Sequence, residues 1–415
     1  MRILYASMML PFPPTFGKRM EIWTTLRALS EAGHDVTLVS FHDPGQKDND
    51  KDALTEVCRD VSLVPLELSR PSSLRDCFDR LAALLTPHAH QAFRYRCAAL
   101  TKCVERHLKT DHYDAVICGE VFMLQNMPAD ICVPLILKKD HIAATILRRY
   151  VASERNLVKK LYAWIEYAKT SRWETSVCRR ATAIMACSNH ERDELQNVFP
   201  GIPVTMAPNV VDLEAYQNDE EEDPKTILYH GLMDWFPNQD AVAYFISEIL
   251  PHLRRLVPDV RVVVAGRTSS QKFPQRFAQV PGVEFTGTVP DMHTYIRQCA
   301  VCIVPLRIAS GTRFKILEAA ALSRPTVSTR IGAEGLDFSD HSEIILADAP
   351  EEFARGVAEL LENPLRRRAM GIAARKRVAT DYSFPELCRA LEETLALVVP
   401  AGAMANLSTS GGPEQ

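Results

Sequence analysis

The sequence predicts an α/β protein built from two Rossmann-like, doubly wound domains that face each other across a cleft. Three observations predict this fold class: a length of 415 residues, a hydrophobic content of 47 %, and strand-like apolar runs that alternate with helical segments. A single hydrophobic core rarely extends beyond about 250–300 residues, so two domains are expected. Strands separated by helices indicate a mainly parallel sheet with helices on both faces, and such sheets bind ligands at the carboxyl ends of their strands.

The first domain is expected over residues 1–200. Six apolar runs predict strands, at residues 2–7, 35–41, 61–66, 114–118, 133–137 and 183–187. A proline-rich loop ending at Gly17 leads into a helix predicted over 19–32, because its apolar residues recur at helical spacing until Gly33 ends the pattern. A second helix is predicted around 74–85, and the polar residues 42–51 predict a surface loop.

The alternation begins again after a boundary near residues 195–225, and the second domain is expected over 201–380. Its predicted strands are 226–229, 260–265, 283–285, 300–304, 325–328 and 344–346. Its predicted helices are 241–256, 292–298, 314–321, 351–361 and 364–380, and a last helix is predicted at 384–398. The acidic run 218–224 is interpreted as a solvated linker, with an interaction patch as the alternative. We expect the last helix, within residues 381–399, to return to the first domain, and residues 400–415 to form a disordered tail.

Charge and composition argue against several classes of protein. The chain has 48 basic and 52 acidic residues, a net charge of −4, whereas a general nucleic-acid binder usually carries a positive field. No run approaches the roughly 18 apolar residues of a membrane-spanning helix, and the first residues read as a strand rather than as a signal peptide. The eleven cysteines are scattered, as in proteins of a reducing compartment, and the pair Cys299 and Cys302 lacks the second ligand pair of a metal site. We therefore expect a cytoplasmic protein, at most peripheral at the inner face of the membrane, with no metal.

The densest chemical signal is the segment Pro305–Ala321. A buried strand ends at Pro305, a short loop with one glycine follows, and a helix is predicted to start near Thr312 as its N-cap. The free amides and dipole of a helix start attract anions, and Arg313 and Lys315 add two positive charges there, so a pyrophosphate is a natural ligand. Glu318 lies about two turns into the helix, where it could reach a ribose diol. The alternative is a surface helix with solvated basic groups.

This segment resembles the nucleotide-sugar loop of glycosyltransferases with the GT-B fold, especially the large retaining family four, or group 1. Members commonly read P-L-R, three small residues, then G-T-R-x-K-I-L-E-A, followed by P-V-V-S-T; here residues 305–321 are followed by P-T-V-S-T at 325–329. Further stretches that resemble the family are residues 10–17, 31–36, 208–212, 230–238, 264–267 and 283–291. The resemblance covers residues 1–398 and is weakest between 42 and 180.

The resemblance implies that the second domain makes most of a donor site. Glu318 matches the glutamate that binds the donor ribose, whereas Ser310 stands where the family has another glutamate, a departure shared by many relatives with this loop. Arg313 and Lys315 would replace the family's usual Arg-Lys pair and stabilise the leaving diphosphate without a metal. The expected donor-binding residues are Gly17, Gly266, Arg267, Thr288, Val289, Pro290, Ser310, Gly311, Thr312, Arg313, Lys315 and Glu318, with the base near 288–290.

The resemblance implies an acceptor side in the first domain. Relatives often show L-D-E-H-N-x-E after a strand and L-R-R on the next helix, and here residues 137–143 and 146–149 stand in those places. Asp140 occupies the position of the family's histidine, and His141 follows it, so we expect either to face the reacting sugar as a catalytic residue. The alternative for His141 is a capping or packing role. Glu120, just beyond another strand, is a weaker candidate.

A basic stretch between residues 147 and 180 bears on the acceptor. It holds nine basic and three acidic residues, a net of +6, interleaved with apolar and aromatic side chains; the basic residues are Arg148, Arg149, Arg155, Lys159, Lys160, Lys169, Arg172, Arg179 and Arg180. A basic helix with aromatics can lie on an anionic membrane. The alternative is a long helix packed on its own domain with a solvated basic face.

We therefore expect a retaining, metal-independent glycosyltransferase of polysaccharide biosynthesis. It would move a sugar from a nucleoside diphosphate donor, UDP- or GDP-linked, to a glycan, lipid-linked or small-molecule acceptor, with no cofactor beyond these substrates. The alternative is a non-catalytic nucleotide-sugar-binding partner of another transferase, which Ser310 and the altered residues 138–141 motivate. A sugar-nucleotide epimerase of the same architecture is a third candidate, disfavoured because its motifs are missing.

Overall fold

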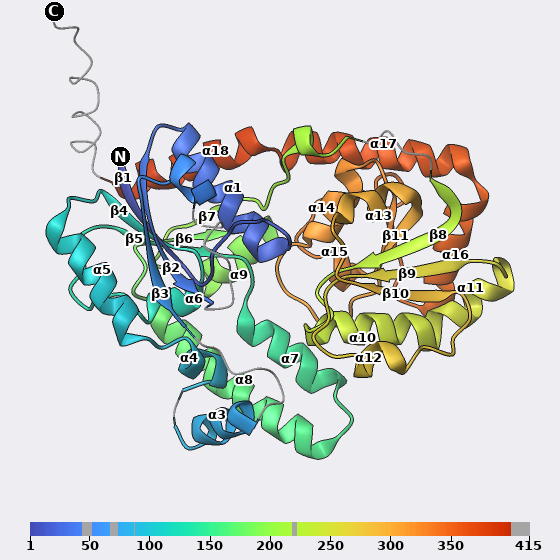
Figure 1. Cartoon of the computed structure of the whole chain (residues 1–415), viewed down its shortest axis with the longest axis horizontal. Coiled ribbons are helices and arrows are strands. Elements are labelled where there is room, and N and C mark those ends of the chain that lie inside the picture. Colours follow the sequence, from blue (N-terminus) through green and yellow to red (C-terminus); the bar gives the residue numbers. More distant parts are fainter. Residues whose placement is uncertain (44–51, 67–73, 87, 218–221, 400–415) are drawn as a thin grey trace, which may run out of the picture. The chain divides into compact units, whose positions relative to one another are not determined.

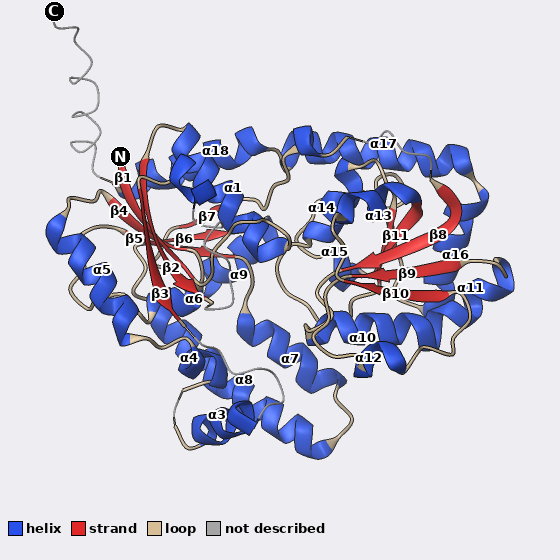
Figure 2. Cartoon of the chain, viewed as in Figure 1, coloured by secondary structure: helices blue, strands red, loops and turns tan. Residues whose placement is uncertain are grey.

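The computed structural model describes residues 1–43, 52–66, 74–86, 88–217 and 222–399 (Figure 1). Its contacts divide the chain into two compact units, which we call unit 1 (Met1–Pro208 and the chain from Leu387 onward) and unit 2 (Asn209–Glu386). Each unit holds an all-parallel sheet with helices around it, so the α/β fold class is confirmed (Figure 2). The predicted tail, most of the loop at 42–51 and residues 218–221 of the acidic linker lie outside the described residues.

Unit 1 contains a seven-stranded sheet with the order β3-β2-β1-β4-β5-β6-β7. Its strands are β1 (Arg2–Ser7), β2 (Asp35–His42), β3 (Asp60–Pro65), β4 (Ala115–Cys118), β5 (Leu135–Lys139), β6 (Ala183–Ala186) and β7 (Val204–Met206). The first six lie where the apolar runs predicted them. The sequence did not predict β7, because three residues are too few to show a period.

The helices of unit 1 follow the strands in alternation. They are α1 (Gly17–Glu31), the 3₁₀ turn η1 (Ala53–Glu56), α3 (Leu74–Leu84), α4 (His90–Arg94), α5 (Ala98–Thr110), α6 (Val121–Leu124), α7 (Ala143–Ser153), α8 (Leu157–Cys178), α9 (Asn189–Val198) and, from the other end of the chain, α18 (Phe384–Val398). Two polar contacts join α18 to unit 1: His34 Nε2 lies 2.5 Å from Glu392 Oε1, and the hydroxyls of Thr205 and Thr394 are 2.8 Å apart.

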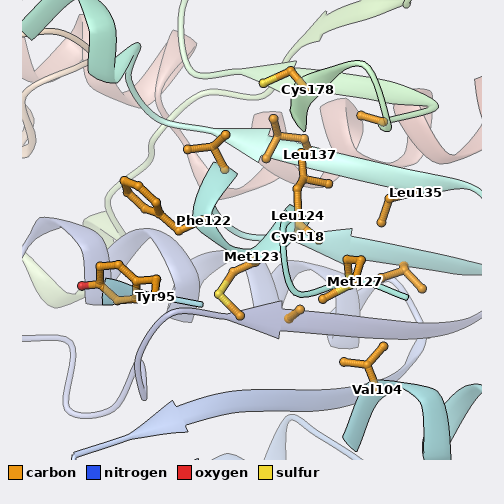
Figure 3. Packing of buried hydrophobic residues seen from close by; sticks show 14 of the residues in the cluster. Tyr95, Val104, Cys118, Phe122, Met123, Leu124, Met127, Leu135, Leu137 and Cys178 are labelled. Atoms are coloured by element: carbon orange, nitrogen blue, oxygen red, sulfur yellow. The ribbon is translucent and has the colours of Figure 1, made fainter. Parts of the chain in front are cut away.

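The core of unit 1 packs between the sheet and the helices α4, α5, α6 and α8 (Figure 3). A row of aromatic rings runs through it: Tyr95 stacks on Phe122 at 5.2 Å between centroids, and Phe122 stacks on Trp173 at 5.3 Å. Because Trp173 lies on α8, this row fixes the C-terminal half of that helix to the sheet. Burial of such rings is a major source of stability.

Unit 2 contains a six-stranded sheet with the order β10-β9-β8-β11-β12-β13. Its strands are β8 (Asp223–His230), β9 (Arg261–Ala265), β10 (Val283–Gly287), β11 (Cys299–Val304), β12 (Thr326–Ser328) and β13 (Ile345–Leu346). Its helices are η2 (Leu213–Ala215), α10 (Phe236–Tyr244), the π-turn η3 (Phe245–Ile249), α11 (Leu250–Leu256), α12 (Lys272–Gln275), α13 (Met292–Gln298), α14 (Phe314–Ala321), α15 (Arg330–Ala333), α16 (Pro350–Glu362) and α17 (Pro364–Asp381).

One correction concerns the acidic linker of unit 2. Glu222 forms ion pairs with Arg324 and Arg367, both of which are buried, and β8 begins at Asp223. This end of the run is therefore fixed to the unit rather than solvated, because two buried guanidinium groups need a carboxylate partner.

In each sheet the strand order reverses at one place, between β1 and β4 in unit 1 and between β8 and β11 in unit 2. Ligands of doubly wound sheets bind at the carboxyl ends of the strands beside such a reversal. The topology thus directs attention to the loops after β1 and β4, and after β8 and β11. Among the described residues, no helix is long and apolar enough to cross a membrane.

Candidate functional site

The loop after β11 and the start of α14 form the centre of the site in unit 2. Gly311 has a φ of 88°, a left-handed conformation that glycine adopts without strain. The helix begins at Phe314 with Arg313 in the N-cap position, so the prediction of Thr312 as N-cap is wrong. The Thr312 hydroxyl instead accepts a hydrogen bond of 2.7 Å from the amide of Asn209, a buried residue at the start of unit 2.

Arg313 is buried and holds the loop together. Its guanidinium donates to the backbone carbonyls of Ser310 at 2.8 Å, of Gly311, and of Ile331 at 3.4 Å. Both terminal nitrogens of the guanidinium, Nη1 and Nη2, therefore donate to backbone carbonyls of the loop and its neighbour. Arg313 orders Ser310 and Gly311 and contributes a positive field to the site.

Lys315 lies in the first turn of α14 and reaches back to the end of β8. Its Nζ donates to the Tyr229 hydroxyl at 2.9 Å and to Asn238 Oδ1 at 3.1 Å, and lies 4.0 Å from the centre of the Tyr229 ring. Burial, followed by the charge of Arg313, lowers the pKa of Lys315 to about 7. All its oxygen partners are neutral, so an incoming anion would favour the charged form of this lysine.

Glu318 faces the last residue of β8. Its Oε2 lies 3.3 Å from Nε2 of His230, and both side chains are largely buried, with 13 % and 6 % exposed. This histidine was not among the predicted site residues. Its position at the end of a strand beside the reversal of strand order was the signal that could have identified it.

Two glycines bring the ends of β8 and β9 into backbone contact. Gly266 has a φ of 142°, and a Cβ built on it would lie 1.9 Å from the carbonyl oxygen of Gly231. The Gly266 N–H donates to Gly287 O at 3.0 Å. Gly266, predicted to bind the donor, thus permits close packing of the strand ends. The next predicted residue, Arg267, has an exposed side chain, and its backbone carbonyl accepts a hydrogen bond from the N–H of Met233.

The predicted base-binding residues 288–290 lie after the end of β10. Thr288 and Pro290 are exposed and Val289 is partly buried, in the loop that leads to α13. Asp291 caps that helix by accepting hydrogen bonds from the backbone N–H groups of His293 and Thr294. The loop therefore ends in a fixed helix start at the same edge of the sheet as Gly231 and Gly311.

In unit 1 the predicted residues Asp140 and His141 follow β5. Asp140 Oδ2 accepts from Lys18 Nζ at 2.7 Å, and its backbone carbonyl accepts from Cys187 Sγ at 3.0 Å. His141 is partly exposed, and its Nδ1 lies 3.7 Å from Glu120 Oε2. The weaker candidate Glu120 is buried. Its side chain caps α6 by accepting a hydrogen bond from the backbone N–H of Val121.

Lys18 gathers these carboxylates into one cluster. Its Nζ lies 3.0 Å from Glu21 Oε2 and 3.6 Å from Glu120 Oε2, and donates to Gly119 O at 2.5 Å. Burial alone would lower the pKa of Lys18, but Asp140, Glu21 and Glu120 outweigh it and raise that pKa. Lys18 and Glu21 were not predicted from the sequence; their spacing of three places both on one face of the helix that opens at Gly17.

The same cluster separates the pKa values of two acids. Burial and the charge of Asp140 raise the pKa of Glu21, although Lys138 Nζ lies 2.6 Å from Glu21 Oε1. Burial would raise the pKa of Asp140 as well, but Lys18 and Lys138 lower it below its usual value. Of these two acids, Asp140 therefore has the lowered pKa and Glu21 the raised one. Gly17 begins α1 directly before Lys18 and has no positive φ.

The structure thus brings the predicted residues together in two groups. In unit 2, Lys315 and Glu318 contact the end of β8, and in unit 1 Asp140, which follows β5, contacts Lys18 at the start of α1. Within the described residues, no group of His, Cys, Asp and Glu is arranged to hold a metal ion. Positive charge and backbone amides beside a strand reversal suit a phosphate-containing ligand in unit 2.

Comparisons with known proteins agree with this arrangement. Residues 22–215 match the family model "Glycosyltransferase Family 4", and residues 224–363 match "Glycosyl transferases group 1". An "Uncharacterized 44.6 kDa protein in cps region" of Klebsiella pneumoniae is 22 % identical over 375 residues, covering 87 % of this chain and 91 % of that protein. Glycogen synthase of Mycobacterium tuberculosis is 23 % identical over 232 residues, covering 52 % of this chain and 54 % of that protein.

Solved structures show the same fold. Sucrose-phosphate synthase from Thermosynechococcus elongatus has a TM-score of 0.69 at 15 % identity, covering 96 % of this chain and 99 % of its own. HepE of Anabaena, solved in complex with UDP, has a TM-score of 0.63 at 13 % identity, covering 96 % of this chain and 100 % of its own. Because the two family models together match most of the chain, it belongs to the group 1 (family 4) glycosyltransferases and has the GT-B fold.

Proposed function

We propose that this chain is a retaining glycosyltransferase that takes a sugar from a UDP- or GDP-linked donor without a metal. The observation that carries the proposal is the position of Lys315. It is a partly buried lysine whose hydrogen-bond partners among the described residues are neutral oxygens, and it lies at the start of a helix beside the reversal of strand order. A diphosphate would supply the anion that this lysine lacks.

In this proposal the donor binds at the carboxyl edge of the unit 2 sheet. Lys315 and the amides at the start of α14 hold the diphosphate, with Ser310, Gly311 and Thr312 presented by the ordered loop. Arg313 supplies a positive field from beneath. Charge that develops on the leaving diphosphate is thereby stabilised by groups fixed in advance. Neighbours of this fold that were solved with UDP or UDP-glucose support a nucleotide donor.

The ribose and the base would lie toward β8 and β10. Glu318 accepts the two ribose hydroxyls, and His230 acts as a positioning residue that fixes the carboxylate at 3.3 Å. The loop 288–290 meets the base, and the exposed Arg267 lies at the neighbouring strand end. A carboxylate that accepts two hydroxyl donors is a common way to recognise a ribose.

Unit 1 would supply the acceptor side. Lys18 holds Asp140 and lowers its pKa, and the partly exposed His141 is the adjacent residue. We propose that these two residues face the reacting sugar while the leaving group departs and the acceptor attacks from the same face. Gly17, at the start of the helix that carries Lys18, would approach the diphosphate.

We propose a polysaccharide, a lipid-linked sugar or a small glycoside as the acceptor, and the cytoplasm as the compartment. The relative from a cps region supports a role in polysaccharide synthesis. The ten cysteines among the described residues are free, which fits a reducing compartment.

A binding screen followed by a transfer assay tests the proposal. We expect UDP-glucose or GDP-mannose to raise the melting temperature of the full chain, since ligands stabilise by mass action. A rise with ADP-glucose alone would contradict the proposed donor class. Lys315→Met should weaken that donor about 10- to 100-fold, the loss of one hydrogen bond to a charged group. Lys376→Met, which removes an exposed lysine of α17, is the matched control and should change nothing.

The transfer assay then distinguishes an enzyme from a binding protein. With an acceptor panel, proton NMR of the product should show the anomeric configuration of the donor retained, and Glu318→Ala should abolish transfer. Tight donor binding without turnover on any acceptor would contradict the proposal and support a non-catalytic nucleotide-sugar binder. Conversion of the donor alone into another sugar nucleotide would indicate an epimerase.

A further inference from the structure

Large apolar side chains are exposed together on two helices of unit 1. Seven of them form what we call the apolar ridge: Phe78, Leu81 and Leu85 on and just after α3, and Leu157, Val158, Leu161 and Trp164 on α8. Their exposed fractions range from 56 % for Trp164 to 87 % for Leu85. Exposed apolar residues that occur singly need no explanation, but a group of this size marks a binding surface.

The ridge on α8 is separate from the face that packs inside unit 1. Leu157, Leu161 and Trp164 follow the spacing i, i+4 and i+7, which places them along one side of a helix. Ala163, Glu166, Thr170 and Trp173 are buried on the opposite side. The helix therefore already has its packed face, and the ridge is a second apolar face left to solvent.

The part of the ridge on α3 is held beside α8 by a lysine. Lys169 Nζ donates to the backbone carbonyls of Ala83 at 2.8 Å, Leu84 at 3.0 Å and Thr86 at 2.8 Å. A cation on the last carbonyls of a helix is a stabilising C-terminal cap. Figure 1 shows α3 lying beside α8, away from the strands of unit 1. Lys169 thus joins the C-terminal end of α3 to α8, the two helices that carry the ridge.

The charges around the α8 part of the ridge are mainly positive. Arg155 lies just before α8, Lys159 and Lys160 lie on it, and no acidic residue occurs between 155 and 165. On α3, Arg80 is exposed. The next acid along α8, Glu166, is buried and accepts the N–H of His90 at 2.9 Å. The acids nearby in sequence are Asp76 and Asp79, which balance Arg75 and Arg80 on α3, and Glu154, which accepts a hydrogen bond from the Tyr150 hydroxyl.

We infer that the apolar ridge docks the protein onto an anionic lipid bilayer. Leucine, phenylalanine and tryptophan side chains enter the boundary between head groups and acyl chains, while the bordering lysines and arginines meet lipid phosphates. Positive residues beside exposed apolar residues favour a bilayer over a protein partner. An anionic membrane presents negative charge on all sides of an inserted apolar strip. The proposed sugar transfer does not depend on this docking.

Vesicle sedimentation with the full chain tests this inference. The probes are vesicles of phosphatidylcholine alone and of phosphatidylcholine with phosphatidylglycerol at about 7:3, chosen because charge strengthens binding of such surfaces. We expect at least about tenfold tighter binding to the anionic vesicles, falling with salt. The triple variant Leu157→Ser, Leu161→Ser, Trp164→Ser should lose at least about tenfold, as insertion scales with buried apolar area.

Two further variants separate docking from unfolding. Leu365→Ser, Ile372→Ser and Leu397→Ser together remove three side chains that are also more than half exposed but lie outside the ridge, and this control should bind as the wild type does. Lys159→Glu with Lys160→Glu keeps every apolar side chain and should abolish the preference for anionic vesicles. Circular dichroism should show unchanged melting for all three.

Several outcomes would overturn the inference. One is a wild-type chain that binds neither vesicle, and another is a ridge variant that binds as well as its control. A third is sedimentation velocity in which the wild type is an oligomer and the ridge variant a monomer, since the ridge would then join two copies of the chain. Binding is measured without any donor, so these results leave the proposed transfer reaction unaffected.

Discussion

The contact between Gly231 and Gly266 leads to a sharp prediction for Gly266→Ala. The new Cβ would lie 1.9 Å from the Gly231 carbonyl oxygen and 2.7 Å from its carbonyl carbon, so the backbone must move. A side chain at this φ costs about 1–3 kcal/mol, and forcing packed backbone apart costs about 1–3 kcal/mol more. We expect a loss of about 2–6 kcal/mol in the stability of unit 2, and therefore a melting temperature lower by about 4–24 °C.

Gly287→Ala is the matched control for this measurement. Gly287 lies at the end of the neighbouring strand, has a φ of 69°, and a Cβ added to it would meet no other atom within 4 Å. It therefore carries the conformational cost without the collision, about 1–2 kcal/mol. Differential scanning fluorimetry of the two variants isolates the collision. If Gly266→Ala melts within about 2 °C of Gly287→Ala, the close packing of the strand ends is refuted.

The remaining predictions concern charge and buried polar groups. The pKa of Lys315 is lowered to about 7 from its usual 10.5, so between these pH values the unfolded chain binds more protons than the folded chain. The stability of the ligand-free chain should therefore rise with pH in this range, whereas its affinity for inorganic pyrophosphate should fall above pH 7. Calorimetry should find both trends weakened in Lys315→Met. Asn126 is buried and bonds three backbone groups, so Asn126→Ala should cost about 2–4 kcal/mol in urea unfolding, a result contradicted by a loss below about 1 kcal/mol. Lys139→Met leaves the buried carboxylate of Glu174 without its cation and should lower the free energy of unfolding by about 3–5 kcal/mol. Adding Glu174→Gln should recover most of that stability. If the double variant recovers none, the unpaired charge is not the cause of the loss.

Sequence patterns predicted the elements well where the signals are local. The helix α18 was predicted to the residue, because Pro385 near its start and the apolar spacing along it are both visible in sequence. The loop before α14 was also predicted, since a buried strand, a glycine and a basic helix start follow one another directly. Residues 305–318 therefore lie where the motif indicated.

The errors come from partners that are distant in sequence. Thr312 has the chemistry of an N-cap, but the side chain of Asn209, about a hundred residues away, takes its hydroxyl. The sequence also did not reveal that Arg313 binds the carbonyls of Ser310 and Ile331, because no local pattern marks those contacts; its role at the diphosphate stays a prediction. Lys18 was missed because its role depends on Asp140, which the sheet brings to the same edge.

The return of the C-terminal helix to unit 1 has a consequence for synthesis. Leu387, Ala390, Leu391 and Leu395 complete the packing of a unit whose other residues end at Pro208. The ribosome therefore delivers the final piece of the first unit only after all of the second has emerged. Unit 2 can fold as an uninterrupted segment, while unit 1 must wait with an unfilled apolar groove, which makes the nascent chain a natural client for chaperones during that interval.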